Sequence, residues 1–205
     1  FSVNSKTNNL KLKTNILKLN KNRTNEIIDI EDAIHPPCFE VVKKSDKDQN
    51  TIKKIYIRIP NYRRWSKNLI SAYSVKSATI PKKFKGKFDS IISYKNQHGV
   101  YCSAKARVRL HGNYKDHINI DTNGKHVYSS IDVRMIDDNI NNFTKFKLFL
   151  PETRGGDNEV FLANLLKEIG LLSPRTSYVD IDINGKKIKM ILQEKLTKEL
   201  LEDNL

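Results

Sequence analysis

Residues 145–193 read KFKLFLPETRGGDNEVFLANLLKEIGLLSPRTSYVDIDINGKKIKMILQ, and this stretch decides the expected fold. It begins with a short apolar strand over residues 146–150, which Pro151 ends. Asp157 is a good N-cap residue, and Glu159 follows in the first turn, where the helix dipole favours a negative charge. The helix should end at Gly170, because glycine is the usual residue after a helix C-terminus.

The rest of the stretch predicts a buried helix face and a β-hairpin. Asn184-Gly185 is a tight-turn sequence, so strands are expected over residues 176–183 and 187–193, with another helix starting over 194–202. The helix carries apolar side chains at helical spacing, which indicates a face packed on the sheet. They are Phe161, Leu162, Leu165, Leu166 and Ile169. We therefore expect the α+β class, with an antiparallel sheet and a packed helix.

Upstream, the pattern predicts further strands over residues 55–59, 88–94, 103–110 and 131–136, because apolar and polar residues alternate there. A helix is expected over residues 62–73 with Trp65 as a core anchor, and residues 111–129 form a polar loop with a turn at Asn123-Gly124. We divide the chain into a weakly packed lead-in (1–40), a basic β-rich N-terminal region (41–99) and the segment 100–205.

The chain is strongly basic, with a formal net charge of +14 over 205 residues. Residues 41–90 hold 14 Lys and Arg against three Asp, a net of +11. Such a field favours nucleotide phosphates, nucleic acid or another anionic polymer, although AT-rich codon usage explains the same excess. The run from Lys82 to Lys87 with Phe84 fits single-stranded nucleic acid, but we favour a lysine-protected strand edge.

Other classes of site find little support. Cys38 and Cys102 form no CxxC motif. The two could form one disulfide, but nothing in the local sequence favours it, and two buried thiols are the expected state. The loop residues His111, Asp116, His117, Asp121 and His126 match no compact metal motif, so no metal site is predicted. No apolar run reaches transmembrane length. We expect a fragment without its natural N-terminus, which could have carried a targeting segment, so the compartment stays open, with the cell envelope or secretion among the options.

A strand lysine and a helix carboxylate are the candidates for phosphate chemistry. Lys145 and Lys147 share one strand face, and Lys147 is nearer the middle of the apolar strand. Glu159 shares a helix face with apolar residues, whereas Glu168 lies at the less favourable C-terminal end. We select Lys147 and Glu159, although a surface lysine and a first-turn glutamate are the ordinary interpretation of the same pattern.

Several short motifs, in order, resemble the CotH kinase family of spore-coat atypical protein kinases, over roughly residues 100–205. They are Arg109-Leu110-His111-Gly112-Asn113, Asn158, Gly170, Pro174-Arg175-Thr176, Asn184-Gly185 and Gln193-Glu194. The resemblance implies a protein-kinase-like small lobe that binds ATP with Mg or Mn, in an enzyme that phosphorylates protein hydroxyl groups. It implies nucleotide contacts from Lys147, Glu159, Arg109, Gly112 and Asn113, and places Gln193 and Glu194 at the hinge near the adenine.

The family's catalytic and metal-binding acidic residues follow the hinge, so the resemblance implies that the catalytic half is absent and that this polypeptide alone does not catalyse phosphoryl transfer. The partner it implies is a protein substrate, and nucleic acid is not favoured. Two other functions stay open: a basic, non-catalytic binding module for nucleic acid or an anionic surface polymer, and a structural envelope protein.

Overall fold

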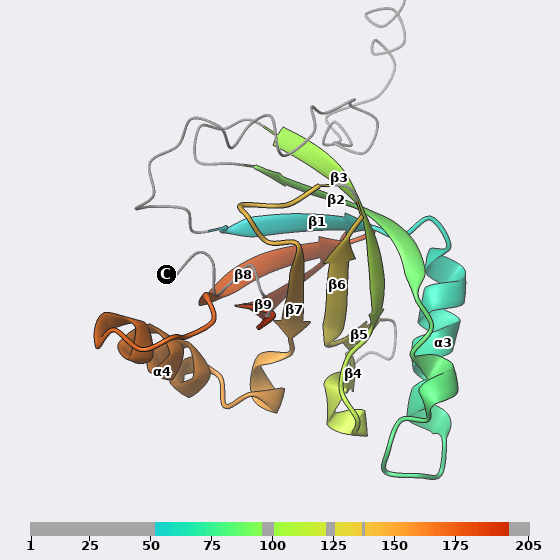
Figure 1. The fold of residues 1–205 in the computed structure, drawn as a ribbon. Helices are drawn as coiled ribbons and strands as arrows, with labels where there is room; N and C mark the ends of the chain where they lie inside the picture. Colours follow the sequence, from blue (N-terminus) through green and yellow to red (C-terminus); the bar gives the residue numbers. More distant parts are fainter. Residues whose placement is uncertain (1–51, 96–100, 122–125, 137, 197–205) are drawn as a thin grey trace, which may run out of the picture. The chain divides into compact units, whose positions relative to one another are not determined.

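Seven β-strands close into a barrel (Figure 1). The computed structural model describes residues 52–95, 101–121, 126–136 and 138–196, all within one compact unit, His35–Leu205. Around the barrel the strand order is β1-β2-β3-β6-β7-β9-β8. The strands are β1 (Lys54–Arg58), β2 (Phe88–Lys95), β3 (Tyr101–Leu110), β6 (Ile131–Met135), β7 (Lys145–Phe149), β8 (Thr176–Ile183) and β9 (Lys186–Glu194).

The barrel closes where β8 meets β1. This pair is parallel, with Ile55 opposite Ile181, whereas every other neighbouring pair is antiparallel. The Asn184 side chain holds the junction: its Oδ1 accepts from the Ile59 backbone N–H at 2.8 Å, and its Nδ2 donates to the Ile59 carbonyl at 3.2 Å. The β8–β9 turn therefore also fixes the end of β1.

The expected α+β fold, a protein-kinase-like small lobe with a basic extension, is wrong. The sheet is closed, and β1 and β2 of the basic region are two of its strands. The physical reason is visible in β1, whose Ile55 and Ile57 are fully buried and need a neighbour on each side. The basic loop 82–87 also borders no free sheet edge, because β2 pairs with both β1 and β3.

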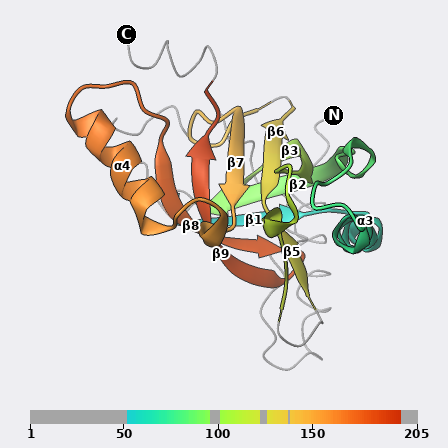
Figure 2. The same cartoon turned by 90° about the horizontal axis from the view of Figure 1, so that it is seen from below.

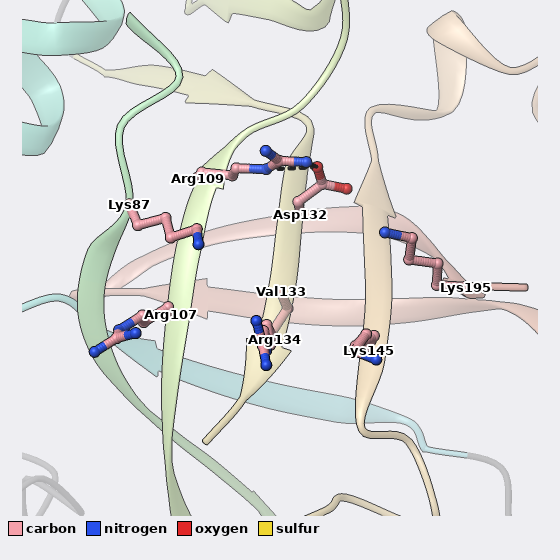
Figure 3. A pocket seen from close by; sticks show the side chains of 8 residues that line it. All are labelled: Lys87, Arg107, Arg109, Asp132, Val133, Arg134, Lys145 and Lys195. Atoms are coloured by element: carbon pink, nitrogen blue, oxygen red, sulfur yellow. Dashed lines mark hydrogen bonds and ion pairs between the residues drawn. The ribbon is translucent and has the colours of Figure 1, made fainter. Parts of the chain in front are cut away.

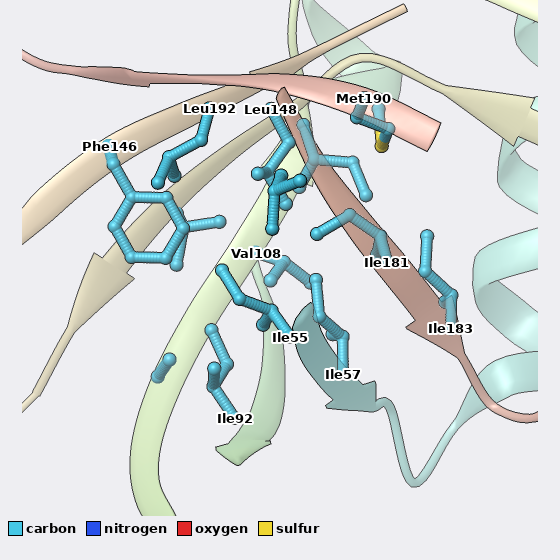
Figure 4. Packing of buried hydrophobic residues seen from close by; sticks show 14 of the residues in the cluster. Ile55, Ile57, Ile92, Val108, Phe146, Leu148, Ile181, Ile183, Met190 and Leu192 are labelled. Carbon is cyan, nitrogen blue, oxygen red and sulfur yellow. The ribbon is translucent and has the colours of Figure 1, made fainter. Parts of the chain in front are cut away.

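Side chains from all seven strands fill the barrel interior (Figure 4). Successive residues of a strand point to opposite faces, so alternate apolar positions turn inward. Ile55, Val108, Phe146, Ile181 and Leu192 are almost completely buried in one cluster. The expected strands are confirmed to within a few residues.

Helix α3 (Tyr62–Ser74) belongs to this core, as predicted. Its buried residues are Trp65, Leu69 and Ala72, and the Trp65 ring meets Phe88 edge-on with 5.2 Å between ring centroids. Between β3 and β6 the expected polar loop contains the turn η3 (Lys115–His117) and a two-stranded sheet of β4 (Ile118–Ile120) and β5 (Val127–Ser129). The turn at Asn123-Gly124 lies outside the described residues.

Helix α4 (Asp157–Glu168) lies outside the barrel, against β8 (Figure 2). It follows the turn η4 (Pro151–Thr153), and Asp157 is its first residue rather than its cap. The predicted buried stripe is wrong: Phe161, Leu162 and Ile169 are 68%, 52% and 61% exposed. Ala163 is the one buried residue of the helix.

The remaining expectations concern other segments. Cys102 is disulfide-bonded, which corrects the expected thiol, and Cys38 lies outside the described residues. Glu194 belongs to β9 rather than to a new helix, and residues 197–205 lie outside the described part, as does the lead-in 1–40. Among the described helices, none has the length and apolar character needed to cross a bilayer.

Candidate anion-binding site

A row of polar side chains crosses the outer face of four strands. The strand registers place Arg109 opposite Asp132, Asp132 opposite Lys147, and Lys147 opposite Gln193. Their chain neighbours, such as Val108, are buried in the barrel, so these four side chains lie on the outer face. Neighbouring strands are about 4.8 Å apart, so the row spans about 14 Å. We call it the Lys147 row.

Lys147 is the cation at the centre of the row. Among the described residues, no carboxylate lies within ion-pair distance of its ammonium group. Its Nζ lies 5.7 Å from the centroid of the Phe149 ring. A half-buried ammonium without a carboxylate partner is available to an anionic ligand.

Asp132 is fully engaged by the protein. Its Oδ2 accepts from Arg109 Nε at 2.9 Å and Nη2 at 2.7 Å, and its Oδ1 lies 3.0 Å from His111 Nδ1. Burial alone raises the pKa of Asp132, but the His111 hydrogen bond and the Arg109 guanidinium outweigh it and lower the pKa to about 2. Asp132 is therefore ionised at neutral pH and orients Arg109 along the row.

Glu159 reaches the other end of the row from α4. Its Oε1 accepts from Gln193 Nε2 and from Arg154 Nη2, both at 2.7 Å. Gln193 is buried and therefore links Lys147 on β7 to the helix. The structure thus brings Lys147, Gln193 and Glu159 together, with an amide between the lysine and the carboxylate.

Gly112 and Asn113 line a pocket that Arg109 and Asp132 also border. Gly112 has φ +94°, and a Cβ there would lie 1.9 Å from the His117 ring, so only glycine fits. The Lys85 ammonium donates to Asn113 Oδ1 at 2.6 Å, which ties the basic loop to this turn. Burial lowers the pKa of His117, and the positive charges of Arg154 and Lys85 act in the same direction.

Glu194 is the predicted site residue that the structure does not bring to this face. It is buried on the opposite side of β9 and forms a two-pronged ion pair with Arg175, at 2.8 and 2.9 Å. Arg175 also lies over the Phe143 ring, 4.1 Å from the centroid. Glu194 therefore has a structural role at the end of the barrel.

The carboxylates on this face do not fit a divalent metal ion. Asp132 is bound by Arg109 and His111, and Glu159 by Arg154 and Gln193. Across the described ranges, no three His, Cys, Asp or Glu side chains gather closely enough to hold a cation. Several cations, by contrast, lie on this face, among them Arg109, Lys145 and Lys147.

Sequence reasoning missed Asp132 within the row and several cations around it. These cations are Lys87, Arg107, Arg134 and Lys195. Arg107, Asp132 and Arg134 sit at alternating polar positions of predicted strands. Alternation places such residues on a wet face, but only the order of strands around the barrel shows that they are neighbours.

Comparison with known proteins returned no match, either to a protein-family model or to a curated protein sequence.

Proposed function

We propose that this chain binds ATP through the phosphate groups, with Lys147 as the central cation, as the ATP-binding portion of a CotH-like atypical protein kinase. The supporting observation is the Lys147 row, in which an ammonium without a carboxylate partner lies between Asp132 and Gln193. Arg109, already oriented by Asp132, adds a guanidinium to the same face. Phosphate oxygens bind well to such a combination of guanidinium and ammonium groups.

The two parts of this proposal have different support. ATP binding is supported by the cations on the outer face of the barrel. This support does not depend on a kinase-like fold. Transfer of phosphate to protein hydroxyl groups rests on the family resemblance of the short motifs alone. A kinase-like small lobe does not support either part, because the sheet is a closed barrel.

Titration of the purified chain with ATP by isothermal calorimetry tests the first part. We expect saturable binding, and we expect Lys147→Met to weaken it by about tenfold or more, since a hydrogen bond to a charged group contributes about 1.5–3 kcal/mol. Lys187→Met is the matched control, because Lys187 lies on the outer face of β9 six residues from Gln193, about 20 Å along the strand. If both variants lose ATP affinity equally, the binding is general charge attraction rather than recognition at Lys147.

The metal dependence gives a second readout of the same experiment. Because Asp132 and Glu159, the carboxylates described on this face, are already engaged by protein groups, we expect metal-free ATP to bind at least as tightly as ATP in excess Mg²⁺. An absolute requirement for Mg²⁺ contradicts the site described here.

The second candidate is a non-catalytic module for nucleic acid, favoured by the Lys85–Asn113 contact that adds the basic loop to the face. This function predicts affinity that falls steeply with salt and is lost when Lys82, Lys83, Lys85 and Lys87 are changed together to Gln. Affinity for a single-stranded oligonucleotide that is insensitive to salt and to these changes excludes it.

A further inference from the structure

A separate basic pocket lies beside the Lys147 row, nearer the start of β7. Figure 3 looks onto it: Arg107, Arg134 and Lys145 come from the neighbouring strands β3, β6 and β7. Their registers place Arg107 opposite Arg134, and Arg134 opposite Lys145. The Lys195 backbone N–H donates to the Lys145 carbonyl at 3.1 Å, which extends the line of cations by one residue beyond β9.

The charge in this pocket is far from balanced. Its lining contains six cationic side chains and one carboxylate, Asp132, a net of +5. The cations are Lys87, Arg107, Arg109, Arg134, Lys145 and Lys195. Asp132 is already bound to Arg109 and His111, and Arg107 has only a solvent-exposed pairing with Asp89 at 3.3 Å. Among the described residues, Arg134, Lys145 and Lys195 have no ion-pair partner.

The size of the pocket restricts the ligand. It encloses about 190 Å³, below the roughly 300 Å³ at which pockets for drug-sized ligands begin. Its lining has no aromatic ring on which a base could stack. Same-side carboxylates of an extended acidic peptide are about 6.8 Å apart, so few of them can enter together. A ligand that carries several negative charges on contiguous groups fits both the charge and the volume.

We propose that this pocket is an oligophosphate-binding site, which takes a chain of two or three linked phosphate groups. The chain can be free or can be the tail of a nucleotide, because the pocket recognises only the phosphates. Arg107 and Arg134 present planar guanidinium groups suited to phosphate oxygens, and Lys145 and Lys195 add mobile point charges. The pocket shares Arg109 and Asp132 with the Lys147 row, but its other five cations come from other positions and Lys147 is not among its lining residues.

Calorimetric titration with inorganic tripolyphosphate and with orthophosphate, at matched ionic strength, tests the site. We expect tripolyphosphate to bind at least about tenfold more tightly, because it engages several cations at once. Arg134→Gln combined with Lys145→Gln should weaken tripolyphosphate binding by about tenfold or more. Arg134→Lys combined with Lys145→Arg should keep most of it, which separates loss of charge from loss of fold.

The control removes the same number of charges elsewhere: Lys67→Gln with Lys187→Gln, both exposed and outside the pocket. If this control weakens binding as much as the pocket variant, or if tripolyphosphate binds no better than orthophosphate, the proposal is overturned. Titration with ATP and with adenosine separates the two sources of the phosphate chain. If tripolyphosphate binds and ATP does not, the pocket stands and the proposed function fails. If ATP binds but the pocket variant binds tripolyphosphate as tightly as the unchanged protein, the proposed function stands and the pocket proposal fails.

Discussion

At the residue scale, two arginine–aspartate pairs on the same sheet differ in what surrounds them. Arg109 and Asp132 meet at 2.7 Å beside His111, and Asp132 keeps only 18% of its side chain exposed. Arg107 and Asp89 meet at 3.3 Å, and Asp89 is 84% exposed. Exposed pairs are screened by water and contribute little, whereas removing one partner of a buried pair is costly.

The Asp132 pair therefore predicts a specific pH dependence. The folded-state pKa of Asp132, about 2, lies below the ordinary value of 3.8, so its stabilisation is fully present above about pH 4 and is lost as the pH falls through 2. Asp132→Asn should lower the free energy of unfolding by about 2 kcal/mol at pH 7 and by much less at pH 2. Urea denaturation at both pH values measures this.

The matched control for this prediction is Asp89→Asn, which should change the free energy of unfolding by less than about 0.5 kcal/mol at either pH. Asp132→Asn should also strengthen tripolyphosphate binding, because it removes the one carboxylate among the described residues that line the basic pocket. Equal stability losses in the two variants would mean that burial of Asp132 contributes nothing.

At the element scale, helix α4 separates what local sequence determines from what it does not. Its start and end follow from Asp157, Gly170 and helix propensity, and these are close to the prediction. Its contacts do not follow, because periodicity shows an apolar face but not which surface covers it. In the structure α4 is held by polar contacts, Tyr178 Oη to Asp157 at 2.7 Å and Gln193 to Glu159 at 2.7 Å, with Ala163 as its buried residue.

The β8–β9 turn was predictable as a turn, but its role in barrel closure was not. Asn184 has φ +49°, which Asn and Gly tolerate, and its side chain binds the Ile59 backbone 125 residues earlier in the chain. Asn184→Gly keeps the turn but removes both hydrogen bonds. We expect it to lower the free energy of unfolding by about 1–3 kcal/mol, as for a buried group left without its partner.

The control for the turn is Gly185→Asn, at the second turn position, where φ is +83° and no atom lies within 4 Å of an added Cβ. It keeps both hydrogen bonds between Asn184 and Ile59, so it should lower the free energy of unfolding by less than Asn184→Gly does. Thermal unfolding followed by circular dichroism compares the two variants. A larger loss of stability from Gly185→Asn would contradict the proposed role of the Asn184 side chain at the β8–β1 junction.

At the scale of the whole molecule, the order of the strands in the sheet creates the candidate site, because β3, β6, β7 and β9 are consecutive neighbours. Lys145 and Lys147 were correctly placed on a strand with one shared face, and Arg107 and Arg109 on another, from alternation alone. In the sheet, β6 lies between these two strands. The order of strands depends on contacts between distant parts of the chain, so no local sequence pattern predicts it. The sequence therefore identified Lys147 and Arg109 as candidates but could not reveal the cations that gather around them.

The central claim is that phosphate ligands bind to the outer face of β3, β6, β7 and the end of β9. Amide chemical shifts recorded by ¹H–¹⁵N correlation NMR, during titration of the ¹⁵N-labelled chain with ATP or tripolyphosphate, test it most directly. We predict that the shifting amides cluster at residues 107–109, 132–134, 145–147 and 193–195. Saturable shifts confined instead to the β8–β9 turn at residues 182–187, or no saturable shifts with either ligand, would contradict it.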